Sequence, residues 1–180
     1  MQTEITRYRV LPDKLRLDMT LQAMGMKISQ VFDGQSAWMI TPQGVQALPA
    51  SQVEEFREDA FRETIYLLTH FSSSDMSVQY LGSEAVDGKL AEVILVTPAA
   101  MDALKLFIDS ETKYIVKKSY QGLSQEGPAA TEEFVDDYRD VSGVKVGFHT
   151  VVHQNGEKFA EGMLSEVTIN AEVDESLFEK

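Results

Sequence analysis

With 180 residues, of which 43% are hydrophobic and 25% charged, the chain is long enough to form one domain with its own core. Its formal net charge of −13 disfavours binding to nucleic acid and electrostatic attachment to anionic membranes. The absence of cysteine excludes disulfides and thiolate metal sites. No apolar run approaches the roughly 18 residues of a membrane-spanning helix, and no signal segment follows Met1.

The first quarter of the chain has the pattern of an antiparallel meander. In residues 15–22 every odd position is apolar and every even position is polar, which is the period of a strand with one buried face. Gly25 lets the chain reverse, and Asp33-Gly34 is the pair that a type I′ hairpin turn favours. We expect strands at residues 3–10, 15–22, 26–32 and 36–40.

The last of these strands carries a resemblance to a known family. The bacterial outer-membrane lipoprotein carriers, the LolA-like family, share a D-G-x-x-x-W-x-x-x-P segment. This chain resembles it at residues 33–42, with Asp33, Gly34, Trp38 and Pro42 in the corresponding places and LPDKLR before them. Later stretches agree in character at residues 82–89, 108–112 and 138–145, and at residues 169–170 with 177–178 near the end of the chain.

The resemblance implies a fold that is mainly β with α. It would be an incomplete antiparallel β-barrel, a curved meander sheet with a helix covering its concave face. Residues 1–180 would form a single LolA-like domain. Since only residues 3–10 stand before Leu11-Pro12, we expect that this chain lacks the family's N-terminal helix and first strand.

Residues 51–71 predict one amphipathic helix of about five turns, because apolar side chains recur every three to four positions. Ser51 is a suitable N-cap, and Glu54 three residues later completes a capping-box pattern. From Met76 the alternation indicates strands again, for a total of roughly nine or ten by their period. Residues 174–178 predict a short helical turn near the end of the chain.

Two groups of polar residues are candidates for a metal-binding site. His149 and His153 are four apart on a strand, so they lie about 13 Å apart and cannot share a metal ion. Their position opposite the apolar face favours exposure to solvent. The acidic residues 132–140 favour a solvated edge strand over a calcium loop. No catalytic motif or cofactor signature occurs, although acid pairs suited to glycoside hydrolysis stay open until spatial separations are known.

The apolar faces support a functional hypothesis, which is an apolar ligand cavity between the sheet and the helix. The competing interpretation is that the same residues pack together as core. Met19, Met24, Met26 and Met39 favour a cavity, because flexible thioethers adapt to varied alkyl chains. The predicted lining is Leu17, Met19, Leu21, Ile28, Trp38 and Ile40 from the sheet, with Phe56, Ala60, Phe61 and Leu67 from the helix.

The resemblance implies non-catalytic carriage of an acyl chain, lipid or lipoprotein in the periplasm or at the outer membrane, without a cofactor. In the family an arginine before the proline is tied to lid closure and cargo handling. Leu11 stands there in this chain, and Arg9 is a candidate replacement. A general apolar-ligand function therefore fits better than lipoprotein transfer itself.

The alternative is an interaction domain of a larger envelope protein, such as the tail of an insulinase-type zinc peptidase. Such a domain would dock its partner through a sheet edge or the outer face of the helix.

Overall fold

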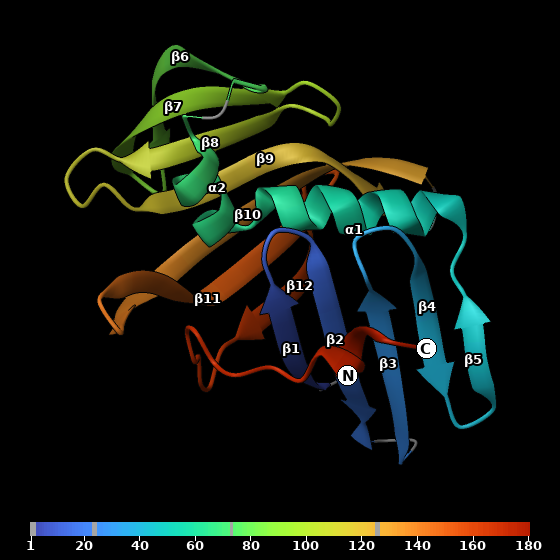
Figure 1. The fold of residues 1–180 in the computed structure, drawn as a ribbon. Helices are drawn as coiled ribbons and strands as arrows, with labels where there is room; N and C mark the ends of the chain where they lie inside the picture. Colours follow the sequence, from blue (N-terminus) through green and yellow to red (C-terminus); the bar gives the residue numbers. More distant parts are fainter. Residues whose placement is uncertain (1–2, 23–24, 73, 125–126) are drawn as a thin grey trace. The chain divides into compact units, whose positions relative to one another are not determined.

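The computed structural model describes residues 3–22, 25–72, 74–124 and 127–180 (Figure 1). The chain divides into two compact units. Unit 1 consists of residues 1–70 and 172–180, and unit 2 of residues 71–171. The single domain expected over residues 1–180 stays a prediction.

Unit 1 contains a five-stranded antiparallel sheet in which each strand pairs with the next along the chain. Among its described residues, two α-helices and the short 3-10 helix near the end of the chain complete the unit. The strands are β1 (Glu4–Val10), β2 (Lys14–Leu21), β3 (Met26–Phe32), β4 (Ala37–Thr41) and β5 (Gly44–Ala47). The helices are α1 (Ala50–Arg62), α2 (Thr64–His70) and η2 (Glu175–Phe178). The predicted strands and the helical turn near the end of the chain are confirmed.

The turn between β3 and β4 differs from the predicted type I′ hairpin. Phe32 pairs with Ala37, so four residues form the loop. The carboxylate of Asp33 accepts hydrogen bonds from the backbone N–H groups of Gln35 and Ser36, at 2.8 and 2.7 Å. Gly34 has a φ of +97°, and a Cβ at this position would lie 2.6 Å from the Asp13 carboxylate. The positive φ favours glycine here, and a larger residue would in addition displace the Asp13 side chain.

The predicted single helix over residues 51–71 is wrong, because the chain is extended at Glu63 and forms two helices. The Glu63 carboxylate accepts hydrogen bonds from the backbone N–H groups of Ile65 and Tyr66, at 2.7 and 3.0 Å. These bonds satisfy the free N–H groups at the start of α2. The predicted N-cap is also wrong, since Pro49 occupies the cap position and Ser51 lies inside α1.

Replacing Glu63 by alanine is expected to lower the free energy of unfolding by about 0.5–2 kcal/mol, the usual cost of losing a helix cap. Glu63→Asp should retain most of the stability, since aspartate is a favourable cap. Chemical denaturation of both variants measures the difference. An alanine variant as stable as the wild type would show that the cap does not stabilise α2.

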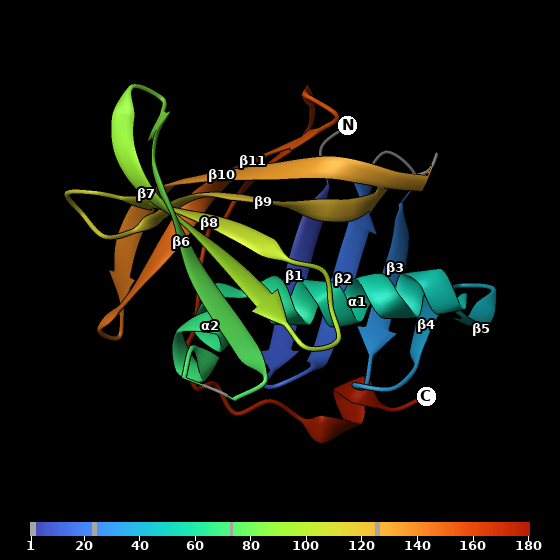
Figure 2. The ribbon, with the colours of Figure 1, turned by 90° about the horizontal axis from the view of Figure 1, so that it is seen from above.

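Each face of the sheet of unit 1 is covered in part by a helix. On one face, Leu15, Phe32 and Ala37 pack against α1, and the rings of Phe32 and Phe56 stack at 5.9 Å. Figures 1 and 2 show α1 lying across the strands. On the other face, Phe178 of η2 packs against Val31 and Trp38. We call these the helix face and the tail face.

Unit 2 is an antiparallel meander of seven strands, ordered β12 to β6 across the sheet. Val86, Ala91, Val93 and Phe107 form its core cluster. The strands are β6 (Met76–Val86), β7 (Lys89–Pro98), β8 (Leu104–Asp109), β9 (Ile115–Ser124), β10 (Gly127–Val141), β11 (Val144–Gln154) and β12 (Glu157–Met163). The described residues thus form twelve strands in the two units, more than the nine or ten expected.

The acidic residues 132–140 lie on β10, and the prediction that they form an edge strand is wrong for Glu132 and Glu133. Strand β10 pairs with β9 at residues 127–134 and with β11 at residues 131–141, so both neighbours flank these two glutamates, whereas the acidic residues after Phe134 pair with β11 alone. Two of its glutamates face lysines of β9, with Lys117 Nζ 2.5 Å from Glu132 and Lys118 Nζ 3.9 Å from Glu133. The neighbouring cations allow an acidic strand to lie inside the sheet.

The predicted fold class is confirmed. The protein is mainly β, with two α-helices in the described residues and two antiparallel sheets that do not close into a barrel.

Candidate apolar ligand site

The strand register of unit 1 assigns each predicted site residue to a face. Leu15 pairs with Phe32, and Phe32 with Ala37, so these three residues define the helix face. Side chains alternate along each strand, and every second residue therefore shares this face. By this register, the helix face also carries Leu17, Met19, Leu21, Met26, Ile28 and Met39. We call these six residues the apolar strip.

Four of the predicted lining residues, Leu17, Met19, Leu21 and Ile28, belong to the strip. The prediction that Trp38 and Ile40 share their surface is wrong, because both lie on the tail face. Trp38 is 1% exposed and packs against Val31 and Phe178. The alternation of apolar and polar residues could not assign Trp38 and Ile40 to a face. The length of the loop before β4 decides which residues of β4 face α1.

The predicted helix residues fall on both helices. Phe56 of α1 packs on the helix face. Ala60 and Phe61, also of α1, are buried, and the Phe61 ring meets Tyr66 edge-on at 6.4 Å. Leu67 is buried on α2. Of the four methionines that favoured a cavity, Met19, Met26 and Met39 lie in the strip, and Met24 lies outside the described residues.

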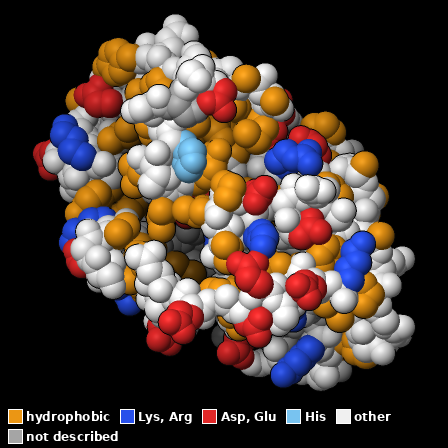
Figure 3. Space-filling model, viewed as in Figure 1, with side chains coloured by type: hydrophobic (Ala, Val, Ile, Leu, Met, Phe, Trp, Pro, Cys, Tyr) orange, Lys and Arg blue, Asp and Glu red, His pale blue; other side chains and the backbone are white. Residues whose placement is uncertain are grey.

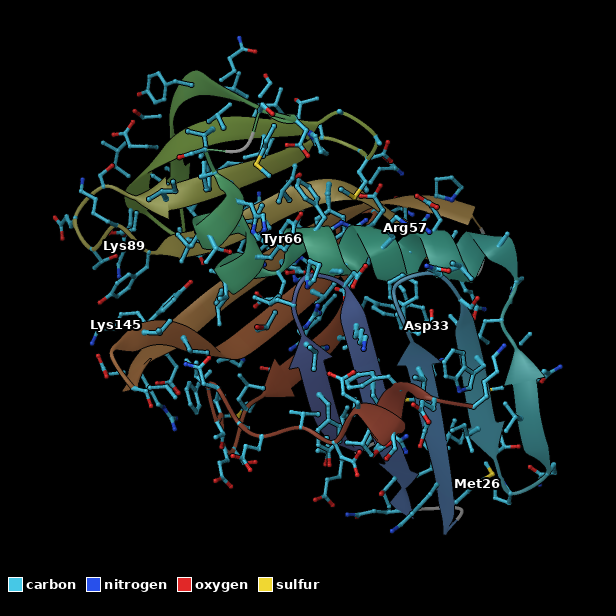
Figure 4. The ribbon with its side chains drawn as sticks, viewed as in Figure 1. Met26, Asp33, Arg57, Tyr66, Lys89 and Lys145 are labelled. Carbon is cyan, nitrogen blue, oxygen red and sulfur yellow. The ribbon has the colours of Figure 1, made fainter. Side chains whose placement is uncertain are left out.

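The apolar strip continues the core of unit 1 beyond the part that α1 covers. At the end next to α1, Leu15, Phe32 and Ala37 are fully buried. Further along the strands, the side chains of the strip are only partly buried. Figure 4 shows this direction, with Asp33 close to α1 and Met26 at the opposite end of β3. The strip is therefore an apolar surface that unit 1 itself leaves partly uncovered.

Arg9 links β1 to α1 at the covered end of the helix face. Its Nη2 atom donates a hydrogen bond to the Asp59 carboxylate at 2.7 Å. Burial alone would raise the pKa of Asp59, but the charges of Arg9 and Arg7 outweigh it and hold the pKa below its ordinary value of 3.8. Arg9 is thus an ionic link between the sheet and α1.

Replacing Asp59 by asparagine is expected to lower the free energy of unfolding at pH 7 by about 0.2–1 kcal/mol, because the Asp59 side chain is 38% exposed and the pair is screened. A carboxyl whose folded-state pKa is lowered stabilises the fold above its unfolded pKa and loses this effect as the pH falls through the folded value. The difference between wild type and variant should therefore shrink as the pH falls below about 4. Denaturation at pH 7 and at pH 3 measures it, and a pH-independent difference would contradict the ionic role.

The histidines of unit 2 do not form a metal site. The carboxylates of Asp136 and Glu161, on the two neighbouring strands, form hydrogen bonds with His149 Nδ1 at 2.8 Å and Nε2 at 2.9 Å, in which the carboxylate oxygens accept. The bonds with Glu161 and Asp136 raise the pKa of His149. The His153 ring lies 5.3 Å from the Phe134 ring. Both histidines are half-buried rather than freely exposed, and no group of three or more potential ligands could hold a metal ion within the described residues.

Comparison with known proteins identifies the fold. No family model matches the chain, and no curated protein matches its sequence. A solved domain from Vibrio parahaemolyticus, described as an outer membrane lipoprotein-sorting protein, superposes with a TM-score of 0.64 at 12% identity. A DUF1329 family protein from Desulfovibrio piger superposes with a TM-score of 0.60 at 12% identity. Both alignments cover 98% of this chain and 80% of the other.

A LolA superfamily protein from Nitrosomonas europaea gives a TM-score of 0.57 at 13% identity, covering 94% of this chain and 77% of the other. At these identities the likeness establishes the fold alone. The chain has a LolA-like fold, as the sequence resemblance implied. Among the described residues, no helix is both long enough and apolar enough to span a membrane.

Proposed function

We propose that the apolar strip of unit 1 binds the alkyl chain of a lipid or lipoprotein, as a non-catalytic carrier without a cofactor. The observation that supports this most is the continuation of the core into six partly exposed apolar side chains on one face of the sheet. Covering such a surface with an alkyl chain contributes roughly 25 cal/mol for each Å² removed from water. Three of the six are methionines, whose flexible side chains adapt to different chains.

The LolA-like fold supports the same proposal. One protein of this fold is described as lipoprotein-sorting, and a carrier of that kind would act in the periplasm or at the outer membrane. Arg9 stands near the family's arginine position and contacts α1 through Asp59. This link is one of the contacts that hold α1 over the buried end of the helix face, so a movement of α1 that uncovers this end would break it and would control loading and release. The comparisons do not favour the alternative of an accessory domain.

The direct test is extraction of gently purified protein with organic solvent, followed by mass spectrometry of the extract. We expect a lipid in near-stoichiometric amount, or stoichiometric uptake of an added long-chain fatty acid by protein that was stripped first. Leu21→Glu should lose the lipid. Protein that carries no lipid and takes up none after stripping would contradict the carrier proposal.

A further inference from the structure

The charged side chains that the sheet of unit 1 places on its helix face have one sign. By the strand register, the only charged residues of β1 to β5 on this face are Arg7 and Arg9. The remaining positions of the face are apolar, glutamine, threonine or glycine. The whole chain has a net charge of −13, and Figure 3 shows acidic side chains gathered on the side of unit 1 where the C-terminal segment runs. Two cations beside an apolar surface are therefore a local feature that runs against the overall charge.

The two arginines differ in their partners. Arg9 donates to Asp59 and holds α1. Arg7 is exposed and, among the described residues, has no hydrogen bond or ion pair, although its charge lowers the pKa of Asp59. Arg16 on the tail face offers a contrast, since it donates to Asp18 and to the carbonyl oxygen of Leu177. The guanidinium of Arg7 is thus available to a group from outside unit 1.

Arg7 lies directly beside the apolar strip. It pairs with Leu17 of β2, and Ile5 on the same strand pairs with Met19. Residues paired in this way have Cβ atoms about 5 Å apart. From Leu17 the strip runs along β2 to Leu21, a distance of about 13 Å at the rise of a strand. An alkyl chain on the strip would therefore begin within reach of the guanidinium.

We propose that the ligand of this site is an amphiphile with an anionic head group, a carboxylate or a phosphate, which Arg7 binds while the alkyl chain lies along Leu17, Met19 and Leu21. This inference rests on the proposed function. A guanidinium suits both head groups because its planar donors can form two parallel hydrogen bonds with either. The net negative charge of the protein opposes long-range attraction of such a ligand, so its recognition depends on contact with Arg7.

The test compares three probes with the same chain length by isothermal titration calorimetry: dodecanoate, dodecyl phosphate and the neutral monolaurin. Wild type should bind at least one anion about five-fold more tightly than monolaurin, the effect of a partly exposed charged pair. Arg7→Gln should lose this preference and bind monolaurin unchanged. Lys27→Gln is the matched control, because it removes an exposed cation from the tail face and should leave all three affinities unchanged.

The two anionic probes distinguish a carboxylate from a phosphate ligand. Equal binding of all three probes to wild type and to Arg7→Gln would overturn this inference and leave the proposed function standing. Loss of monolaurin binding in Arg7→Gln would also overturn it, because Arg7 would then be needed for the site itself and not for the anion. If none of the probes binds the wild type, the proposed function fails and the inference fails with it.

Discussion

Ile28→Glu is expected to abolish binding of a long-chain lipid, lowering the affinity at least about 100-fold. Ile28 lies on the helix face, paired with Met19 in the middle of the apolar strip. A carboxylate at this position must lose water when an alkyl chain covers it, and the structure places no cation of the sheet next to it. An uncompensated charge or polar group costs several kcal/mol in such surroundings, and each 1.4 kcal/mol is about a factor of ten in affinity.

Thr20→Glu is the matched control for this prediction. It adds the same charge to the same hairpin, but Thr20 lies on the tail face and pairs with Lys27. We expect this variant to bind lipid like the wild type. Titration of stripped protein with a fluorescent fatty acid measures both affinities. Binding by Ile28→Glu at wild-type strength, or equal losses in both variants, would show that the helix face is not the site.

Phe32→Ala is expected to lower the free energy of unfolding by about 3–5 kcal/mol, the usual cost of deleting a fully buried aromatic ring. Phe32 is 0% exposed. Its ring stacks on Phe56 of α1, and Leu15 and Ala37 surround it on the sheet. Removing the ring therefore leaves a cavity between α1 and the strands, in the contact that positions the covered end of the site.

Fluorescence of the only tryptophan, Trp38, follows the unfolding of unit 1 during chemical denaturation. Phe159→Ala is the control, because this phenylalanine is 67% exposed and its replacement should change stability by no more than about 0.5 kcal/mol. Similar small decreases in the free energy of unfolding of both variants would contradict the role of Phe32 as the anchor of α1.

The strands of unit 1 could be predicted because their alternation is local and strong. The shared face of Leu17, Met19, Leu21 and Ile28 was predictable for the same reason, since one reversal near Gly25 joins two regular strands. The face of Trp38 was not predictable, because the Asp33 side chain stabilises a four-residue loop that alternation does not encode. A change of one residue in such a loop exchanges the two faces of the strand that follows.

Two other predictions were wrong because individual side chains had more effect than the sequence pattern of the segment around them. The apolar stripe of residues 51–71 continues through Glu63, but the carboxylate of Glu63 caps a second helix and interrupts the first. The acidity of residues 132–140 indicated an edge, whereas at Glu132 and Glu133 the strand lies between two neighbours and lysines on β9 compensate the charge. Arg7 could not be predicted from the net charge, because the charge of the whole chain is −13 and hides a local pair of cations. The signal that could have found it is the alternation of Ile5, Arg7 and Arg9 on one face of the first strand.

The most direct test of the account is photo-cross-linking with a fatty acid that carries a diazirine in the middle of its chain. After irradiation of the full chain, tandem mass spectrometry identifies the modified residues. We expect adducts on β2 and β3 at Leu17, Met19 or Ile28, and their loss when unlabelled fatty acid is added in excess. Adducts that avoid β2 and β3, or that concentrate on the tail face around Trp38, would contradict the claim that the helix face of unit 1 holds the alkyl chain.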